Sequence, residues 1–180
     1  DRYTLVNDFA AVAHAVVNAP EKQLLHLAGP EKSLPQDGVV SVIGPGTGLG
    51  VAHLWRDGSG GYRVHATEGG HIDFAPLDQI EDSILARLRQ HHDRVSVERV
   101  VSGPGIVDIY HALAALEHKA VEEIDDRTIW QLGISGQDSL ASAAVDRFCL
   151  SLGAVSGDLA LAQGASGVVI AGGLGYRIRD

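Results

Sequence analysis

The run Gly44–Gly50 combines four glycines at alternate positions with one hydroxyl, that of Thr47. Backbone N–H groups that carry no side chains can form an anion-binding nest. The run lacks the Gly-Lys-Ser/Thr ending of a Walker loop, and its glycines do not have the spacing of the dinucleotide fingerprint. It also joins two expected strands, so no helix dipole adds to it. The run predicts a phosphate-binding turn, with a plain hairpin turn as the alternative.

A carboxylate and an imidazole stand three positions apart at Glu68 and His71, with two glycines between them. Such a pair can bind neighbouring hydroxyls, because the carboxylate accepts hydrogen bonds and the imidazole can donate or accept. Asp73 is close, but no His-x3-His pair accompanies it, so the spacing does not favour a metal site. A loop with a solvated Glu and a structural His is the alternative.

Asp8 and Glu98 are two further carboxylates that could take part in catalysis or binding. Asp8 and the preceding Asn7 open the Ala-rich run Phe9–Val16, and either is a natural helix N-cap. An Asp at a helix start that faces a cleft can instead act as a general base toward a hydroxyl. Glu98 is expected at the edge of a short strand, Glu98–Val101, and a solvated surface side chain is its alternative.

The elements that must position these residues alternate between strands and helices. A buried strand is expected at Val39–Ile43, and the segments Val51–Arg56 and Tyr62–Ala66 are expected to follow it as antiparallel strands. Helices are expected over Phe9–Val16, Ile80–His91, Gly105–Leu116 and Ser139–Gly164, and a last buried strand over Gly167–Gly173, with loops over 18–38 and no clear pattern over 119–135. This order predicts an α/β fold with a mixed β-sheet and flanking helices.

Composition excludes several classes of protein. The 180 residues are 45% hydrophobic and 21% charged, which is typical of a globular domain. The net charge of −9 disfavours nucleic acid as a partner, and the chain has no apolar run long enough for a membrane span and no secretory signal. Cys149 is the only cysteine, which excludes an internal disulfide and fits a cytoplasmic location. We expect Cys149 to lie on a helix with its side chain in the protein core, and we do not expect it to act as a nucleophile.

Both ends of the sequence favour a piece of a longer protein. The chain contains no methionine, Asp1 stands in sequence that reads as ordered, and Arg177–Asp180 resembles the start of a helix. We therefore expect the middle of a longer chain.

Taken together, five segments resemble the bacterial glucokinases, ATP-dependent enzymes of the hexokinase/actin-like superfamily. In chain order they are Val6–Phe9, Gly46–His53, Glu68–Pro76, Glu98–Gly105 and Val169–Gly173. Each motif alone is weakly specific, but five in the family's order are strong, and they cover nearly the whole chain. The resemblance implies a ribonuclease H-like large domain of the actin/hexokinase type over 21–180. Residues 1–20 would be the tail of a small domain and the interdomain segment.

The resemblance also implies a role for each candidate residue. Asp8 would be the general base that takes the proton of the glucose 6-hydroxyl, and glucose 6-phosphate would be the product. The sugar would be bound by Asn7, Asp8, Glu68, His71 and Glu98, the phosphates of ATP by Gly46, Thr47 and Gly48, and its adenosine side by Gly172 and Gly173. Mg²⁺ would arrive with ATP. Family members are often dimers, so a homodimer is implied.

The sequence departs from the family pattern in one respect. The family's first phosphate loop, of the type Asp-x-Gly-Gly-Thr, and its C-terminal helix are not among these 180 residues. Related sugar kinases and repressors with a Cys-rich zinc loop are disfavoured, because Cys149 stands alone. A non-catalytic sugar-sensing regulator on the same scaffold stays open, although Asp8 argues against it. So does a phosphate-binding module that uses only Gly44–Gly50.

Overall fold

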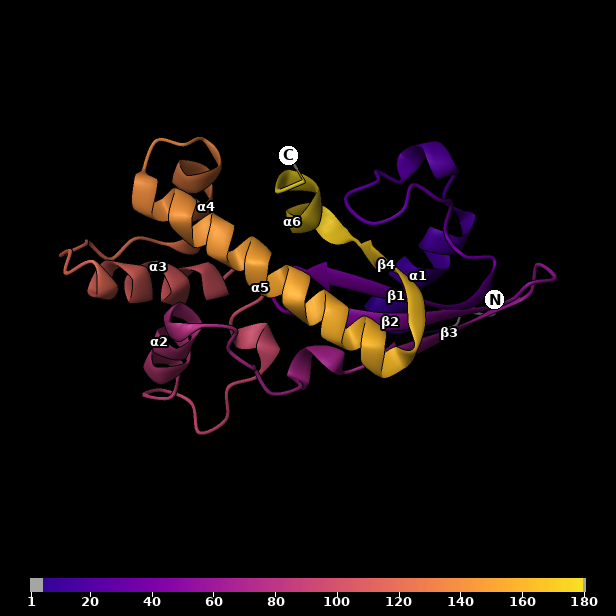
Figure 1. Cartoon of the computed structure of the whole chain (residues 1–180), viewed down its shortest axis with the longest axis horizontal. Helices are drawn as coiled ribbons and strands as arrows, with labels where there is room; N and C mark the ends of the chain where they lie inside the picture. The colour runs from indigo at the N-terminus through magenta and orange to yellow at the C-terminus, as the bar shows by residue number, and fades with distance from the viewer. Residues whose placement is uncertain (1–4, 180) are drawn as a thin grey trace. The chain divides into compact units, whose positions relative to one another are not determined.

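A computed structural model describes residues 5–179 of the chain, and these contain one mixed β-sheet together with helices (Figure 1). The described residues divide into two compact units. The first contains 5–44, 50–69 and 156–179, and the second contains 45–49 and 70–155. Residues 1–4 of the expected segment 1–20 and residue 180 of the expected domain 21–180 lie outside the described residues.

The sheet has four strands in the order β3-β2-β1-β4. They are β1 (Asp37–Pro45), β2 (Leu49–Asp57), β3 (Tyr62–Thr67) and β4 (Ala165–Ile170). β2 and β3 pair antiparallel, whereas β1 and β4 pair parallel with Ile43 opposite Ile170. The expected mixed sheet is therefore confirmed, and the glycine run joins β1 to β2 as strand to strand.

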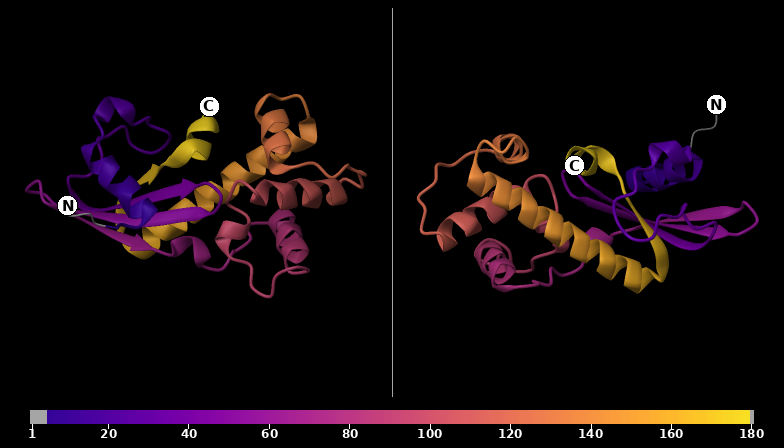
Figure 2. Two further views of the ribbon diagram at one scale, coloured as in Figure 1. Left: turned by 180° about the vertical axis from the view of Figure 1, so that it is seen from behind. Right: turned by 45° about the horizontal axis from the view of Figure 1, so that its top comes forward.

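Helix α1 (Asp8–Asn18) covers one face of the sheet in the first unit (Figure 2). The helix begins where the sequence predicts, because Asn7 caps it and an Ala- and Val-rich run follows. Its buried side chains share one core cluster with alternate residues of β1 and β2, namely Ala13, Val16, Val40, Val42, Ala52 and Leu54. Alternate residues of a strand face opposite sides, so Ser41 and Val51 point to the other face.

The last turns of α5 (Ser139–Gln163) lie on that opposite face. Ser41 Oγ donates a hydrogen bond to Gln163 Oε1 at 2.5 Å. A Cβ added to Gly69 would lie 3.0 Å from Val51 and 3.2 Å from Leu159. The sheet of the first unit is thus covered on both faces by helical segments.

The second unit is built from α2 (Gln79–Leu88), α3 (Gly105–Leu116), α4 (Asp126–Ile134) and the first part of α5. The ring of Phe148, which is fully buried, meets Trp130 edge to face at a centroid distance of 4.8 Å. Leu140, Ala144 and Leu152 are buried on the same α5 stripe, as the sequence predicts. Helix α4 lies in the segment that showed no clear pattern.

The strand expected at Glu98–Val101 is wrong. The chain instead forms a 3-10 turn, η3 (Val97–Arg99), in which the N–H groups of Val100 and Val101 both bond to the carbonyl of Val97. Val97, Val100 and Val101 are all buried, so a single helical turn already satisfies their spacing. β-branched residues favour a strand only where a sheet offers them neighbours.

The C-terminal expectations also need correction. β4 covers 165–170 rather than 167–173, and it is one of the two edge strands of the described sheet, with Val168 37% exposed. A positive φ of 89° at Gly172, which favours glycine, turns the chain into α6 (Gly172–Arg177). Arg177 therefore ends a helix instead of starting one.

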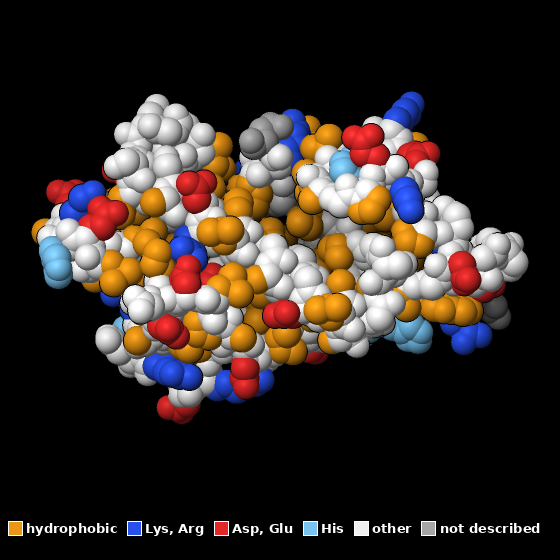
Figure 3. Space-filling model, in the orientation of Figure 1, with side chains coloured by type: hydrophobic (Ala, Val, Ile, Leu, Met, Phe, Trp, Pro, Cys, Tyr) orange, Lys and Arg blue, Asp and Glu red, His pale blue; other side chains and the backbone are white. Residues whose placement is uncertain are grey.

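One face of the described surface mixes both signs of charge. On the face that Figure 3 displays, Asp and Glu side chains are interspersed with Lys and Arg side chains. Among residues 5–179, no helix is long and apolar enough to cross a membrane.

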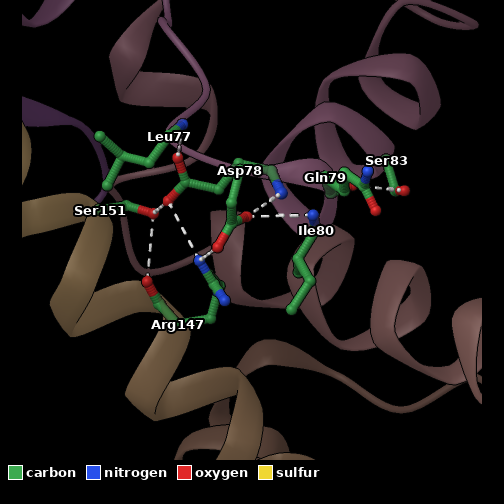
Figure 4. Close-up of polar contacts among 8 residues, drawn as sticks. Leu77, Asp78, Gln79, Ile80, Ser83, Arg147 and Ser151 are labelled. Carbon is green, nitrogen blue, oxygen red and sulfur yellow. Dashed lines mark hydrogen bonds and ion pairs between the residues drawn. The ribbon is translucent and has the colours of Figure 1, made fainter.

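A buried polar network ties the start of α2 to α5 (Figure 4). Glu81 is fully buried, and its carboxylate accepts hydrogen bonds from Leu77 N at 2.7 Å and from Ser151 Oγ at 2.6 Å. Asp78 caps α2 and accepts a hydrogen bond from Arg147 Nη1 at 2.7 Å. The N–H of Glu81 and the Arg147 guanidinium lower the pKa of Asp78 below its ordinary value of 3.8.

We expect Asp78→Asn to lower the unfolding midpoint of the full-length protein near neutral pH. Asn caps a helix about as well as Asp, so the change removes mainly the charge that Arg147 faces. Because the folded pKa of Asp78 is depressed, its ionic contribution to stability is present above pH 3.8 and is lost as the pH falls through the folded pKa. Melting curves measured at a series of pH values should show that the unfolding midpoints of the wild type and the variant converge in acid. A difference that stays constant with pH would contradict this assignment.

Candidate functional site

Asp8 is the first residue of α1, and the capping role belongs to its neighbour. Asn7 Oδ1 accepts hydrogen bonds from the N–H groups of Phe9 at 2.9 Å and Ala10 at 3.0 Å. Asp8 is exposed, and its Oδ1 also accepts from Phe9 N at 2.7 Å. Its Oδ2 has no hydrogen-bond partner within residues 5–179, so this oxygen is available to a ligand.

The ring of Phe9 fixes where α1 begins. A Cβ added to Gly44 or to Gly50 would overlap this ring, so the aromatic side chain lies directly against both glycines. Gly44 is near the end of β1 and Gly50 near the start of β2. Asp8 therefore begins its helix beside the two strand ends that the glycine run connects.

The glycine run forms a tight turn whose amides have different roles. Gly46 N donates to Gly48 O at 2.8 Å within the turn, and Leu49 N donates to a side chain elsewhere. The N–H groups of Thr47 and Gly48 make no hydrogen bond within the described part of the chain. Gly46 and Thr47 are exposed. The turn thus offers the amides of Thr47 and Gly48 to an anion, a narrower set than the whole run.

The side chain that holds Leu49 N is Glu98, at a distance of 2.8 Å to Oε2. Glu98 is half-buried on η3 and lies against the turn closely enough that a Cβ on Gly48 would overlap its carboxylate. The expectation that Glu98 lies at the edge of a strand is therefore wrong, because Glu98 lies on the 3-10 turn η3. No sequence signal indicated this contact, because the two partners are 49 positions apart.

Glu68 and His71 stand on either side of the glycine pair Gly69-Gly70 directly after β3, and His71 is the last residue of the 3-10 turn η2 (Gly69–His71). A Cβ on Gly70 would overlap the carbonyl oxygen of Leu49, so glycine is needed there for the close approach of the two backbones. Both Glu68 and His71 are exposed. His71 O accepts from Arg94 Nη2 at 2.9 Å, while Arg94 Nε pairs with Asp73 at 2.5 Å.

Gly172 and Gly173 follow β4 beside the end of β1. β1 and β4 are parallel, and Ala171 N donates to Ile43 O at 2.7 Å, so both strands end side by side. Gly173 has no atom within 4 Å of an added Cβ, which leaves open space above it. In α/β proteins, ligands bind beyond the carboxyl ends of parallel strands.

The candidate residues are distributed over both units. Asn7, Asp8, Glu68, Gly172 and Gly173 belong to the first unit, and Gly46, Thr47, Gly48, His71 and Glu98 belong to the second. Within the first, the structure brings Asp8 to the ends of β1 and β2. Within the second, it brings Glu98 onto the turn.

Two other kinds of chemistry, metal binding and nucleophilic attack by a thiol, find no support among residues 5–179. Residues 5–179 contain no cluster of three His, Cys, Asp or Glu side chains that could hold a metal ion. Cys149 is exposed on α5 rather than in the core, which corrects the expectation from the sequence. Desolvation and the nearby Asp146 raise the pKa of its thiol, which opposes a nucleophilic role.

Comparison with known proteins points in one direction. The family model described as Glucokinase matches residues 1–180. The chain is 60% identical to the glucokinase of Zymomonas mobilis over 178 residues, which is 99% of this chain and 55% of that protein. The chain therefore spans about half the length of the curated relatives that it matches.

Solved structures resemble this one over most of the chain. The glucokinase of an Antarctic psychrotroph has a TM-score of 0.83 at 36% identity, covering 97% of this chain and 55% of that one. The glucokinase of Balamuthia mandrillaris, solved in complex with glucose, has a TM-score of 0.77 at 22% identity, covering 94% and 50%. The second likeness concerns the fold alone.

Proposed function

Because this chain belongs to the glucokinase family, we propose that the full-length protein transfers the γ-phosphoryl group of ATP to the 6-hydroxyl of glucose. The products are glucose 6-phosphate and ADP. The observation that carries the proposal lies within the first unit. Phe9, next to Asp8 at the start of α1, packs against Gly44 and Gly50, and Ala171 N, directly before the glycine pair Gly172-Gly173, donates a hydrogen bond to Ile43 O of β1.

Asp8 acts as the general base. Its Oδ2 accepts the proton of the sugar 6-hydroxyl while that oxygen bonds to the γ-phosphorus and the bond from this phosphorus to the β–γ bridging oxygen breaks. Asn7 supports this role in two ways. Its Oδ1 caps α1, so Asp8 is not needed as a cap, and its amide group lies one residue from the base, where it can bond a second hydroxyl.

The glycine turn holds the phosphates. The amides of Thr47 and Gly48 and the Thr47 hydroxyl donate hydrogen bonds to phosphate oxygens, and the small residues allow close approach. Gly172 and Gly173 line the adenosine side. Such a site works through positioning and charge, with no covalent intermediate. Mg²⁺ bound to ATP would supply charge neutralisation, and Mg²⁺ commonly takes most of its ligands from substrate phosphates and water.

Glu68, His71 and Glu98 bind the remaining hydroxyls of glucose. We expect Glu68→Ala to weaken glucose binding by about tenfold or more, because losing one hydrogen-bond partner in a desolvated site costs about 1–3 kcal/mol. Isothermal titration calorimetry on the full-length protein measures this. Glu122→Ala, which removes an exposed carboxylate from the loop before α4, is the matched control and should leave the affinity unchanged. Unchanged affinity in Glu68→Ala would remove this residue from the site.

The 180-residue chain by itself should not phosphorylate glucose. It spans 55% of the length of a 60% identical glucokinase, and the Asp-x-Gly-Gly-Thr phosphate loop of the family is not among its residues. A coupled assay that oxidises glucose 6-phosphate tests this, with the full-length protein as the positive control. Turnover by the short chain comparable to that of the full-length protein would show that this loop is dispensable.

Several further features extend the proposal. Residues 1–20 belong to the segment that connects a small domain to the large domain, and 21–180 form most of the large domain. The enzyme works in the cytoplasm and assembles as a homodimer. The sugar-sensing regulator is less favoured, because a regulator has no need of a carboxylate positioned as Asp8 is.

The proposed function is tested by offering ATP with a panel of hexoses to the full-length protein in the same coupled format. We expect ADP release to depend on glucose. ADP release that is independent of any sugar would indicate a phosphate-binding ATPase instead.

A further inference from the structure

Glu98 contacts the glycine turn as well as belonging to the proposed sugar site. Its Oε2 accepts the N–H of Leu49 at 2.8 Å, and its carboxylate packs where a Cβ of Gly48 would be. A carboxylate that accepts a backbone N–H makes a charge-assisted hydrogen bond, which is stronger than a neutral one. The position of the turn therefore depends on the position of this side chain.

The other end of the turn is held by the same segment of chain. Gly103 N donates to Gly46 O at 2.7 Å, and Gly103 O in turn accepts from Trp130 Nε1 at 2.9 Å. Trp130 is buried against Phe148 in the core of the second unit. The end at Gly46 is thus anchored to the core, whereas the end at Leu49 depends on a half-buried carboxylate.

The second oxygen of Glu98, Oε1, has no hydrogen-bond partner within residues 5–179. A carboxylate has about four acceptor positions, so Oε1 can take a hydroxyl hydrogen while Oε2 keeps Leu49 N. We propose that Glu98 is a bridge between the two substrates: one oxygen binds glucose, the other positions the phosphate-binding turn, and each substrate thereby tightens the binding of the other. This inference rests on the proposed function and adds a coupling role to a sugar ligand.

The physical reason for the coupling is the immobilisation of one side chain. Bound glucose holds the Glu98 carboxylate in the orientation that also holds Leu49 N, so the open amides of Thr47 and Gly48 are pre-positioned for phosphate. By linkage, a nucleotide that orders the turn must raise the affinity for glucose by the same factor. Coupling of this kind is typically about 5–150-fold.

The first test measures binding of the non-hydrolysable analogue AMPPNP to the full-length protein by calorimetry, with and without saturating glucose. Without sugar, Glu98→Ala should bind AMPPNP on the order of tenfold more weakly than the wild type, because Leu49 N loses its acceptor. Glu98→Gln keeps an oxygen that Leu49 N can reach but removes the charge, so its affinity for AMPPNP should lie between those of Glu98→Ala and the wild type. A residue that binds only the sugar predicts equal AMPPNP affinity in all three proteins.

The second test changes the turn and measures the sugar. Gly48→Ala pushes the Glu98 carboxylate away, so glucose affinity without nucleotide should fall several-fold, by about fivefold or more. Gly153→Ala on α5 is the control, because an added Cβ there also has nothing within 4 Å and Gly153 belongs to neither proposed binding site. Its glucose affinity without nucleotide should equal that of the wild type. This pair of glycine variants still tests the bridging role of Glu98 if a melting curve shows that Glu98→Ala does not fold.

The outcomes separate the bridge from the proposed function. Wild-type protein that binds both ligands with no mutual tightening overturns the bridge and leaves the kinase intact. Wild-type protein that binds neither ligand overturns both. Mutual tightening that disappears in Glu98→Ala, together with the loss of glucose affinity in Gly48→Ala but not in Gly153→Ala, supports the bridge.

Discussion

Asp8→Asn in the full-length protein should lower kcat by about 10²–10⁴-fold, because general base catalysis typically contributes that much. Asn has nearly the same shape and cannot accept the proton. The affinity for glucose should change far less, since the amide oxygen still accepts a hydrogen bond. Steady-state kinetics and calorimetry on the same preparation measure both quantities.

The helix-cap alternative for Asp8 predicts the opposite pattern. Asn caps about as well as Asp, and Asn7 already holds the N–H groups of Phe9 and Ala10. A role limited to capping would therefore leave kcat near the wild-type value. Matching melting curves establish that the variant is folded, and a folded variant with normal turnover would remove the base assignment.

Gly50→Ala should lower kcat by about 10²-fold, although residue 50 contributes no side chain to the chemistry. The added methyl group overlaps the ring of Phe9, which must move and take the first turn of α1 and Asp8 with it. A displacement of about 1 Å at a reacting group can cost about that factor. Kinetics with both substrates varied should place the loss mainly in kcat.

A second change tests the mechanism of this loss. Phe9→Leu in the Gly50→Ala background makes room for the methyl group, so part of kcat should return, and the two changes should be strongly non-additive. Gly157→Ala on α5 is the control, because an added Cβ there meets nothing within 4 Å. Additive effects of Phe9→Leu and Gly50→Ala would show that the ring does not transmit the change.

Local sequence predicted the elements whose cause is local. The cap at Asn7, the strands on either side of the glycine turn, the antiparallel pairing of β2 with β3 and the buried stripe of α5 follow from residue types within a few positions of each other. The role of glycine in the turn could be expected as well, since no other residue leaves its backbone so accessible.

Features that depend on distant partners were not predictable in this way. The strand expected over Glu98–Val101 does not form, because a single 3-10 turn already buries the valines of this segment. β4 is an exposed edge strand, because the order of strands in a sheet is a tertiary property. The bond from Leu49 to Glu98 joins residues whose separation carries no pattern. Because this bond occupies Leu49 N, the amides that remain for a phosphate are those of Thr47 and Gly48, and the sequence alone could not show this.

The central claim is that ATP phosphorylates the 6-hydroxyl of glucose with Asp8 as the base. The most direct measurement is ³¹P NMR of full-length wild-type protein and Asp8→Asn, each mixed with ATP, Mg²⁺ and glucose. We expect the signals of glucose 6-phosphate and ADP to grow together in the wild type and to grow about 10²–10⁴-fold more slowly in the variant. A phosphorylated product other than glucose 6-phosphate, or equal rates in the two proteins, would contradict the account.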